Sequence, residues 1–152
     1  MKKIIIIDGN SLLFRAYYAT SFTGNIMRRK DGFPTNALFG FSNMMTKLTS
    51  YLKEGDLFFV AFDTGHKTFR HEQMETYKAQ RKKIEEDLCV QIPIARDLLD
   101  AMGIYHFELD GYEGDDIAGT VAKIASKEGY QVNIYTSDKD YLQLIDDNIS
   151  IN

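Results

Sequence analysis

The chain has 152 residues, of which 44% are apolar and 26% charged, with a formal net charge of −4. This is the composition of one globular domain with its own core, and it excludes a disordered chain. No apolar run is long enough for a membrane span or a signal-peptide core, which favours the cytoplasm. The single Cys89 excludes an internal disulfide, and its helical surroundings predict a reduced core thiol.

Four apolar runs of strand length lie along the chain, and acidic residues follow each of them. The first run, residues 4–7, consists of isoleucine alone, which is typical of a strand buried on both faces of a parallel sheet. The other three runs cover residues 57–62, 104–107 and 132–136. A further extended run, separate from these four, begins at Asn148. The acids that follow the four runs are Asp8, Asp63, Glu113, Asp115, Asp116, Asp138 and Asp140.

Between these runs, apolar residues recur at three- and four-residue steps, which predicts helices. Pro93 lies inside one of these patterns and should kink the helix or mark a restart. Residues 20–34 show no period, and Arg28, Arg29 and Lys30 predict a basic loop tip there. The predicted helices cover about residues 12–17, 36–52, 84–102, 117–127 and 140–145. In the fourth helix, the predicted inner face consists of Ile117, Val121, Ile124 and Ala125.

Strands that alternate with helices predict an α/β fold, in which a doubly wound, mostly parallel sheet carries helices on both faces. In such sheets, ligands bind outside the carboxyl ends of the strands. All four acidic elements should therefore meet at one edge, although Asp8 and Asp140 are far apart in sequence. Taken alone, the pair Asp115 and Asp116 is explained equally well as the N-cap and first residue of a helix.

Carboxylates that converge without a histidine or cysteine partner favour hard cations, Mg²⁺ or Mn²⁺, over zinc. The three histidines have no ligand spacing and are interpreted as surface or strand residues. More acids than one ion needs predict two ions that together clamp the attacking and leaving oxygens of a phosphodiester. The predicted metal ligands are Asp8, Asp63, Glu113, Asp115, Asp116, Asp138 and Asp140.

Residues 66–83 form a basic segment that leaves the sheet from one of the acidic strand ends. Such a run is often only a solvated face, but positive charge with interleaved aromatic rings also suits a phosphate backbone and its bases. Without the seven acids, 18 basic residues remain against 15 acidic ones. The predicted reaction is therefore metal-dependent hydrolysis of nucleic acid. The basic residues of the segment are Lys67, Arg70, Lys78, Arg81, Lys82 and Lys83, and Phe69, Met74 and Tyr77 lie between them.

Five motifs also carry a resemblance to a known family. The sequence resembles the bacterial 5′–3′ exonuclease and flap-endonuclease family, which includes the N-terminal nuclease domain of DNA polymerase I. The resemblance implies one domain over residues 1–152 with a PIN-like or resolvase-like nuclease core and a helical arch at about residues 64–92. The motifs are Ile7-Asp8-Gly9-Asn10-Ser11 with Phe14-Arg15-Ala16, Phe62-Asp63 with Thr68-Phe69-Arg70, Tyr77-Lys78-Ala79-Gln80-Arg81, Gly111-Tyr112-Glu113-Gly114-Asp115-Asp116, and Ser137-Asp138-Lys139-Asp140.

The resemblance also implies roles for residues and partners. The seven acids would bind two Mg²⁺ or Mn²⁺ ions, directly or through water, and Tyr77, Lys78 and Arg81 would act at the scissile phosphate. The partners would be DNA with 5′ flaps or 5′ ends and RNA–DNA primer junctions, in replication and repair. The protein would be a cytoplasmic, nucleoid-associated monomer, without a membrane, fused to or working with a DNA polymerase. The DNA-binding residues would be Arg15, Arg70, Tyr77, Lys78, Arg81, Lys82 and Lys83.

Two departures from the family leave alternatives open. Gly114 replaces the usual alanine and should loosen the acidic loop slightly. The sequence also ends before the helix–hairpin–helix that grips duplex DNA and before the last acidic pair of the second metal site. One alternative is therefore a truncated, catalytically silent module that binds branched DNA or a protein. Another is a receiver-like Mg²⁺ phosphotransfer switch, which leaves the basic segment unexplained.

Overall fold

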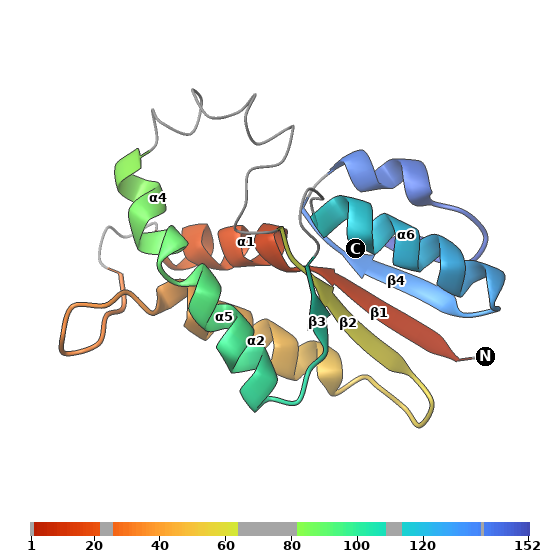
Figure 1. The fold of residues 1–152 in the computed structure, drawn as a ribbon, viewed down its shortest axis with the longest axis horizontal. Helices are drawn as coiled ribbons and strands as arrows, with labels where there is room; N and C mark the ends of the chain where they lie inside the picture. The colour runs from red at the N-terminus through yellow and green to blue at the C-terminus, as the bar shows by residue number, and fades with distance from the viewer. Residues whose placement is uncertain (1, 22–25, 64–81, 109–113, 138) are drawn as a thin grey trace.

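The computed structural model describes residues 2–21, 26–63, 82–108, 114–137 and 139–152. Within them, five parallel strands form one sheet in the order β3-β2-β1-β4-β5, with β1 at its centre (Figure 1). Each predicted apolar run forms a strand, and the late extended run forms the fifth. The strands are β1 (Lys3–Asp8), β2 (Leu57–Ala61), β3 (His106–Phe107), β4 (Gln131–Tyr135) and β5 (Ile149–Ile151).

Helices connect the strands, as the apolar periodicity predicts. Pro93 does mark a restart, because one helix ends at Cys89 and the next begins at Ile92 with the proline in its first turn. None of the helices that the structure describes is long and apolar enough to cross a membrane. The helices are α1 (Gly9–Ser21), α2 (Asn36–Thr49), α4 (Lys82–Cys89), α5 (Ile92–Ala101), α6 (Gly114–Lys127) and the 3-10 helix η1 (Lys139–Leu144).

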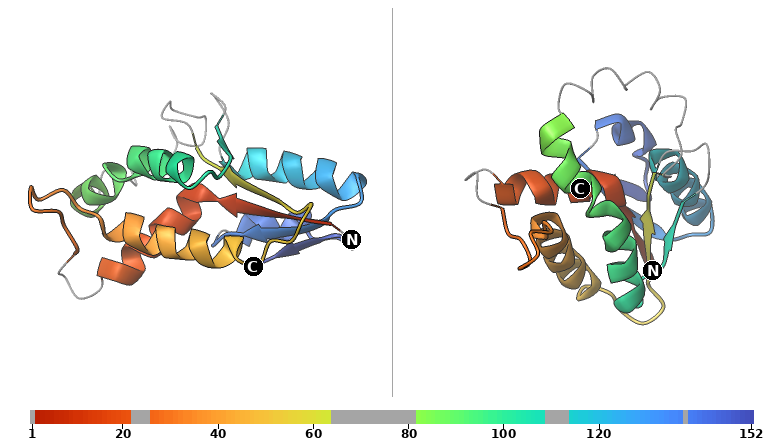
Figure 2. Two further views of the ribbon diagram at one scale, coloured as in Figure 1. Left: turned by 90° about the horizontal axis from the view of Figure 1, so that it is seen from below. Right: turned by 60° about the vertical axis from the view of Figure 1, so that its left-hand side comes forward.

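The helices cover both faces of the sheet, which confirms the predicted doubly wound class. The alternation of side chains along β1 separates the two cores, because Ile5 and Ile7 pack on one face while Ile4 and Ile6 pack on the other. The first core contains buried side chains of α1, α2, α4 and α5, and the second those of α6 and η1. Figures 1 and 2 show α4 beyond α5, away from the sheet.

Two predictions about inner faces are wrong. Ile124 was expected in the core but is 59% exposed, whereas Ile117 and Ala125 of the predicted face are buried as expected. The buried face of α6 also contains Ala118 and Ala122, which are fully buried. Small alanine side chains allow a helix to lie close to a sheet, so this face needs no larger residue. Cys89 is exposed at the end of α4, because its neighbour Leu88 occupies the inner position.

Candidate metal centre at the carboxyl edge of the sheet

Two of the predicted acids lie at the ends of adjacent strands. Asp8 is the last residue of β1 and pairs in register with Ala61, the last residue of β2, and Asp63 lies two residues after Ala61. The charge of Asp63 acts on Asp8 as a repulsion. The chain can turn into α1 directly after Asp8 because residue 9 is glycine: a Cβ there would lie 2.5 Å from the ring of Phe62.

Asp8 is an unusual carboxylate because it is only 7% exposed. Its pKa is raised from 3.8 to about 6, chiefly by burial and to a smaller extent by the charge of Asp63. Hydrogen bonds oppose this effect: the Ser11 N–H donates to Oδ1 at 3.3 Å and the Thr136 hydroxyl donates to Oδ2 at 3.0 Å. The Tyr141 side chain of η1 also lowers the pKa of Asp8. The carboxylate is therefore oriented by donors, yet its negative charge is not neutralised by them.

Asp63 is held by two helices. Its backbone N–H donates to Oδ1 of Asn10 in α1 at 2.9 Å. Its carboxylate Oδ1 accepts a hydrogen bond from the backbone N–H of Gly114, the first residue of α6. A Cβ on Gly114 would lie 3.3 Å from both the Ala61 carbonyl and the Asp63 carboxylate. Glycine at this position therefore allows the start of α6 to lie close against the end of β2.

The end of β4 joins the same edge through Ser11. The Ser11 hydroxyl oxygen accepts a hydrogen bond from the Ser137 N–H at 2.7 Å and lies 3.4 Å from the Thr136 hydroxyl. The first turn of α1 thus contacts the chain just after both neighbouring strands: Asn10 bonds to Asp63 after β2, and Ser11 bonds to Ser137 after β4. These hydrogen bonds hold the end of β4, at Thr136 and Ser137, next to Asp8.

The capping interpretation is wrong in register, because α6 begins at Gly114 and Asp116 is therefore its third residue, two positions deeper than predicted; Asp116 is exposed. It lines a hollow of about 450 Å³ with Thr120 and apolar residues of β2, β3 and α6. Across the part of the chain that the structure describes, no three His, Cys, Asp or Glu residues form a group that could hold a metal. The other predicted ligands lie outside that part, by whole residue or by side chain: Glu113, Asp115, Asp138 and Asp140.

Arg15 is the one predicted DNA-binding residue whose side chain the structure describes. It is exposed on α1 and lines a shallow hollow of about 410 Å³ together with Ser11 and Ser137. Phe14 and Tyr18 complete the lining, and their rings stack with centroids 6.5 Å apart and planes 13° apart. The other predicted residues lie outside the described part, by whole residue or by side chain: Arg70, Tyr77, Lys78, Arg81, Lys82 and Lys83.

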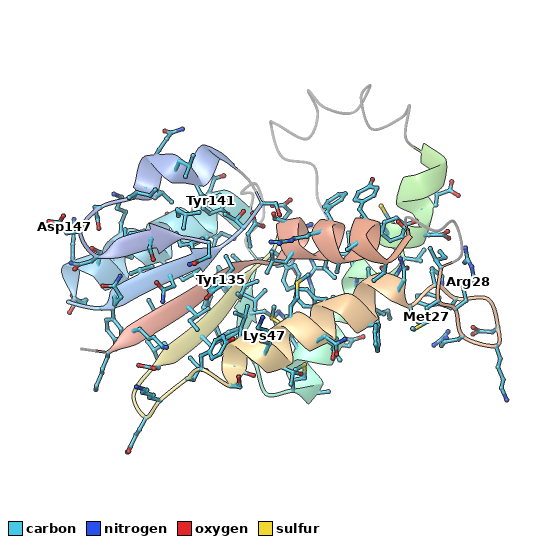
Figure 3. The ribbon with its side chains drawn as sticks, turned by 180° about the vertical axis from the view of Figure 1, so that it is seen from behind. Met27, Arg28, Lys47, Tyr135, Tyr141 and Asp147 are labelled. Carbon is cyan, nitrogen blue, oxygen red and sulfur yellow. The ribbon has the colours of Figure 1, made fainter. Side chains whose placement is uncertain are left out.

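The predicted basic loop tip, residues 28–30, is exposed and contacts α4 through an ion pair. Arg28, labelled in Figure 3, forms an ion pair with Asp87 of α4 at 2.9 Å, and Arg29 pairs with its neighbour Asp31 at 2.8 Å. Each of these ion pairs uses part of the positive charge of the tip. His106 lies in β3 and contacts Asp100 at 2.8 Å, as expected of a strand residue.

Sequence reasoning assigned no role to several residues that shape this edge. They are polar residues in the turn after β1, one at the end of β4 and one in η1. A signal for the first group was available, because short side chains after a buried strand commonly bond to nearby backbone. Nothing in the sequence pairs Thr136 or Tyr141 with Asp8. The unassigned residues are Asn10, Ser11, Thr136 and Tyr141.

The sequence of this chain matches a family model and the sequences of known proteins. Residues 3–152 match the family model described as the N-terminal resolvase-like domain of 5′-3′ exonucleases. DNA polymerase I of Bacillus subtilis (strain 168) is 41% identical over 150 residues, which are 99% of this chain and 16% of that protein. The thermostable DNA polymerase I of Thermus filiformis is 36% identical over 150 residues, or 99% and 17% of the two proteins. The chain thus spans about one sixth of these relatives.

Solved structures share the fold at lower sequence identity. The bacteriophage T5 5′-exonuclease with bound divalent zinc ions superposes with a TM-score of 0.71 at 23% identity, covering 99% of this chain and 54% of that one. The T5 flap endonuclease in a pseudo-enzyme-product complex with DNA and metal ions gives 0.67 at 18% identity, with the same coverage. These likenesses concern the fold alone.

Proposed function

This chain belongs to the family of N-terminal resolvase-like domains of 5′-3′ exonucleases, and from that premise we propose that it hydrolyses phosphodiester bonds of nucleic acid with divalent cations. Its substrates would be DNA 5′ ends and 5′ flaps and RNA–DNA primer junctions. The ions would be Mg²⁺ or Mn²⁺, two in the complete site. Their ligands would be the seven predicted acids, of which Asp8, Asp63 and Asp116 have described surroundings.

The single observation that supports this proposal most strongly is the buried Asp8 carboxylate beside Asp63. Burying an anion is unfavourable unless a positive charge neutralises it. Here two carboxylates lie at adjacent strand ends, and burial with mutual repulsion already raises the pKa of Asp8 to about 6. Oxygen ligands of this kind suit a hard divalent cation. When bound, such a cation neutralises the phosphate and lowers the pKa of an attacking water.

The residues of the chain would orient the site and hold the substrate. The Ser11 N–H and the Thr136 hydroxyl fix the two oxygens of Asp8. Beside them, Arg15 offers a permanent positive charge to a phosphate, and the stacked rings of Phe14 and Tyr18 offer an apolar surface to a base. We assign phosphate binding near the scissile bond to the basic segment at residues 66–83.

The proposal extends to the setting of the reaction. We propose one domain over residues 1–152, with an arch at about residues 64–92, that works as a monomer. Because the relatives are DNA polymerases I, we infer that it acts in replication and repair, fused to or alongside a polymerase. We place it in the cytoplasm with the nucleoid.

The test is a cleavage assay on a flap substrate. The chain of 152 residues is incubated with DNA carrying a labelled 5′ flap, with Mn²⁺ or with a chelator. We expect short labelled products with Mn²⁺ and none with chelator. Asp63→Asn should remove the products while the fold is retained in circular dichroism. Asp147→Asn is the matched control, because Asp147 lies just before β5, at the opposite edge of the parallel sheet (Figure 3).

Each other outcome has a definite meaning. Binding of the flap substrate without any product would favour the catalytically silent module. Products that persist in chelator, or that Asp63→Asn leaves undiminished, would refute a role of this acidic edge in hydrolysis. Equal loss in the Asp63 and Asp147 variants would show that charge alone, and not position, explains the effect.

A further inference from the structure

Arg96 of α5 contacts the ends of two strands at the candidate metal centre. Its Nη2 atom donates to the backbone carbonyl of Asp63 at 2.9 Å and pairs with the Glu108 carboxylate at 3.0 Å. The Arg96 side chain is only 19% exposed. One guanidinium therefore joins Asp63, two residues after β2, to Glu108, the residue directly after β3. In sequence, Glu108 precedes the predicted ligand Glu113 by five residues.

Arg96 supplies the third of three bonds that fix Asp63. The N–H of Asp63 donates to Asn10, and its carboxylate accepts from the Gly114 N–H. The carbonyl is the remaining polar group, and Arg96 is its donor. With all three groups bonded to different helices, the peptide planes on both sides of Asp63 have fixed orientations. The direction of its carboxylate is thereby fixed relative to Asp8.

The guanidinium also stabilises the Phe62 side chain, which packs next to the residue that follows Asp8. Its central carbon lies 5.0 Å from the centroid of the Phe62 ring, a distance at which a cation attracts an aromatic face. Phe62 is fully buried and packs directly against Gly9, the residue after Asp8. A continuous line of contacts thus runs from Arg96 through Phe62 to the turn that carries Asp8.

The position of the Arg96 side chain leaves one of its polar atoms, Nε, buried without a hydrogen bond among the described residues. An unsatisfied buried N–H is costly. A surface ion pair between α5 and β3 could form without burying this atom. The cost is accounted for if the guanidinium must reach the Asp63 carbonyl and the Phe62 face together.

We propose that Arg96 is a positioning residue for divalent-cation binding, which acts through the backbone of Asp63 and does not touch the cation. The inference rests on the proposed function, because it assigns the Asp63 carboxylate to a cation. Residues that orient metal ligands from the second layer typically change metal affinity 10- to 100-fold when they are replaced. Arg96 should behave in this way, whereas a purely structural ion pair should change stability alone.

The test compares Mn²⁺ binding in three variants by isothermal titration calorimetry, with metal-free unfolding measured in parallel. Arg96→Met keeps the apolar length and loses every donor, and we expect it to weaken Mn²⁺ binding by roughly tenfold or more. Arg96→Lys keeps the charge but not the planar fork, and should weaken binding by a smaller factor. Glu108→Gln is the matched control, because its amide oxygen still accepts from Arg96 and the Asp63 bond persists.

The outcomes separate this inference from the proposed function. Lower stability of Arg96→Met with Mn²⁺ affinity equal to that of the wild type would overturn the positioning role and leave the proposed nuclease intact. An equal loss of affinity in Glu108→Gln would also overturn it, since the Asp63 bond would not be the cause. If Arg96→Met does not fold, Arg96→Lys decides alone, and unchanged Mn²⁺ affinity in that variant refutes the role. A wild-type chain that neither binds Mn²⁺ nor cleaves the flap substrate would refute the proposed function itself.

Discussion

Replacing Asp8 with asparagine should stabilise the metal-free protein, although it removes a residue proposed as essential. The ionised carboxylate is buried beside Asp63, and this raises its pKa from 3.8 to about 6. A tenfold change in an equilibrium constant corresponds to about 1.4 kcal/mol. The shift therefore corresponds to about 3 kcal/mol of destabilisation at neutral pH. Asparagine keeps an oxygen for the Ser11 N–H and carries no charge.

The pH dependence has a defined sign. Because the pKa of Asp8 is higher in the folded state, the folded protein holds a proton that the unfolded chain has released between about pH 4 and pH 6. The wild type should lose stability as pH rises through this window and reach its full loss above about pH 7. Asp8→Asn should lack this loss. Below about pH 3 the two proteins should be nearly equal in stability, because Asp8 is then protonated in both states.

Divalent cations should reverse the order of stability. A ligand that binds only the folded state at 1,000 times its dissociation constant adds about 4.1 kcal/mol, which exceeds the cost of the buried charge. The wild type should gain this stability with Mg²⁺ or Mn²⁺, and Asp8→Asn should gain little. Urea unfolding followed by circular dichroism measures both effects, with chelator or cation, at pH 4.5, 6 and 8, values chosen to span the window. Asp97→Asn, at an exposed position of α5, is the control and should follow the wild type.

One result would refute this reasoning about Asp8. If Asp8→Asn is less stable than the wild type in chelator at pH 8, the carboxylate stabilises the fold and needs no cation. In that case the hydrogen bonds from Ser11 and Thr136 outweigh the burial of the charge. A cation effect of equal size in both proteins would instead place the bound ion away from Asp8.

Three further substitutions test the burial of individual side chains in the fold, each by urea unfolding. Gly9→Ala should destabilise the protein by about 1–3 kcal/mol, because its Cβ would lie 2.5 Å from the Phe62 ring; an unchanged midpoint would mean that the ring moves freely. Gln91→Leu should cost about 1–3 kcal/mol, since Gln91 is fully buried and donates to Asn36 at 3.0 Å; stability equal to the wild type would show that water replaces it. Ile124→Lys should stay within about 0.5 kcal/mol of the wild type because Ile124 is 59% exposed, and a larger loss would place it in an interface.

Sequence patterns were sufficient for the strands and for the edge where the acids lie. Runs such as residues 4–7 are apolar at every position, and only a central parallel strand buries both faces, so type and location followed together. Because parallel strands end at one edge, the positions of Asp8 and Asp63 on adjacent strands needed no three-dimensional information beyond the strand order. That order, with β1 between β2 and β4, was not available from periodicity.

Inner faces and long-range partners were harder to predict. The periodicity of α6 allowed either Ile124 or the alanines at 118 and 122 to face the sheet, and hydrophobicity favoured the isoleucine wrongly. A sheet only a short distance from the helix axis selects small residues instead. Arg96 bonds to Asp63, which lies 33 positions away in the sequence, and Thr136 bonds to Asp8, which lies 128 positions away. Periodicity describes neighbours along one element and carries no information about such pairs.

The energetic pattern of the fold itself distinguishes an enzyme from a silent module. Two unfavourable features, the buried charge of Asp8 and the buried Nε of Arg96, lie at the same edge of the sheet. A module that merely binds branched DNA through a basic surface has no need to retain either, because neither touches a phosphate. A cation at this edge would neutralise Asp8, and it would make use of the orientation that Arg96 gives to Asp63. Cation binding should therefore add most stability where the proposed reaction occurs, so that hydrogen exchange at β1 and β2 slows on addition of Mn²⁺ more than at β5.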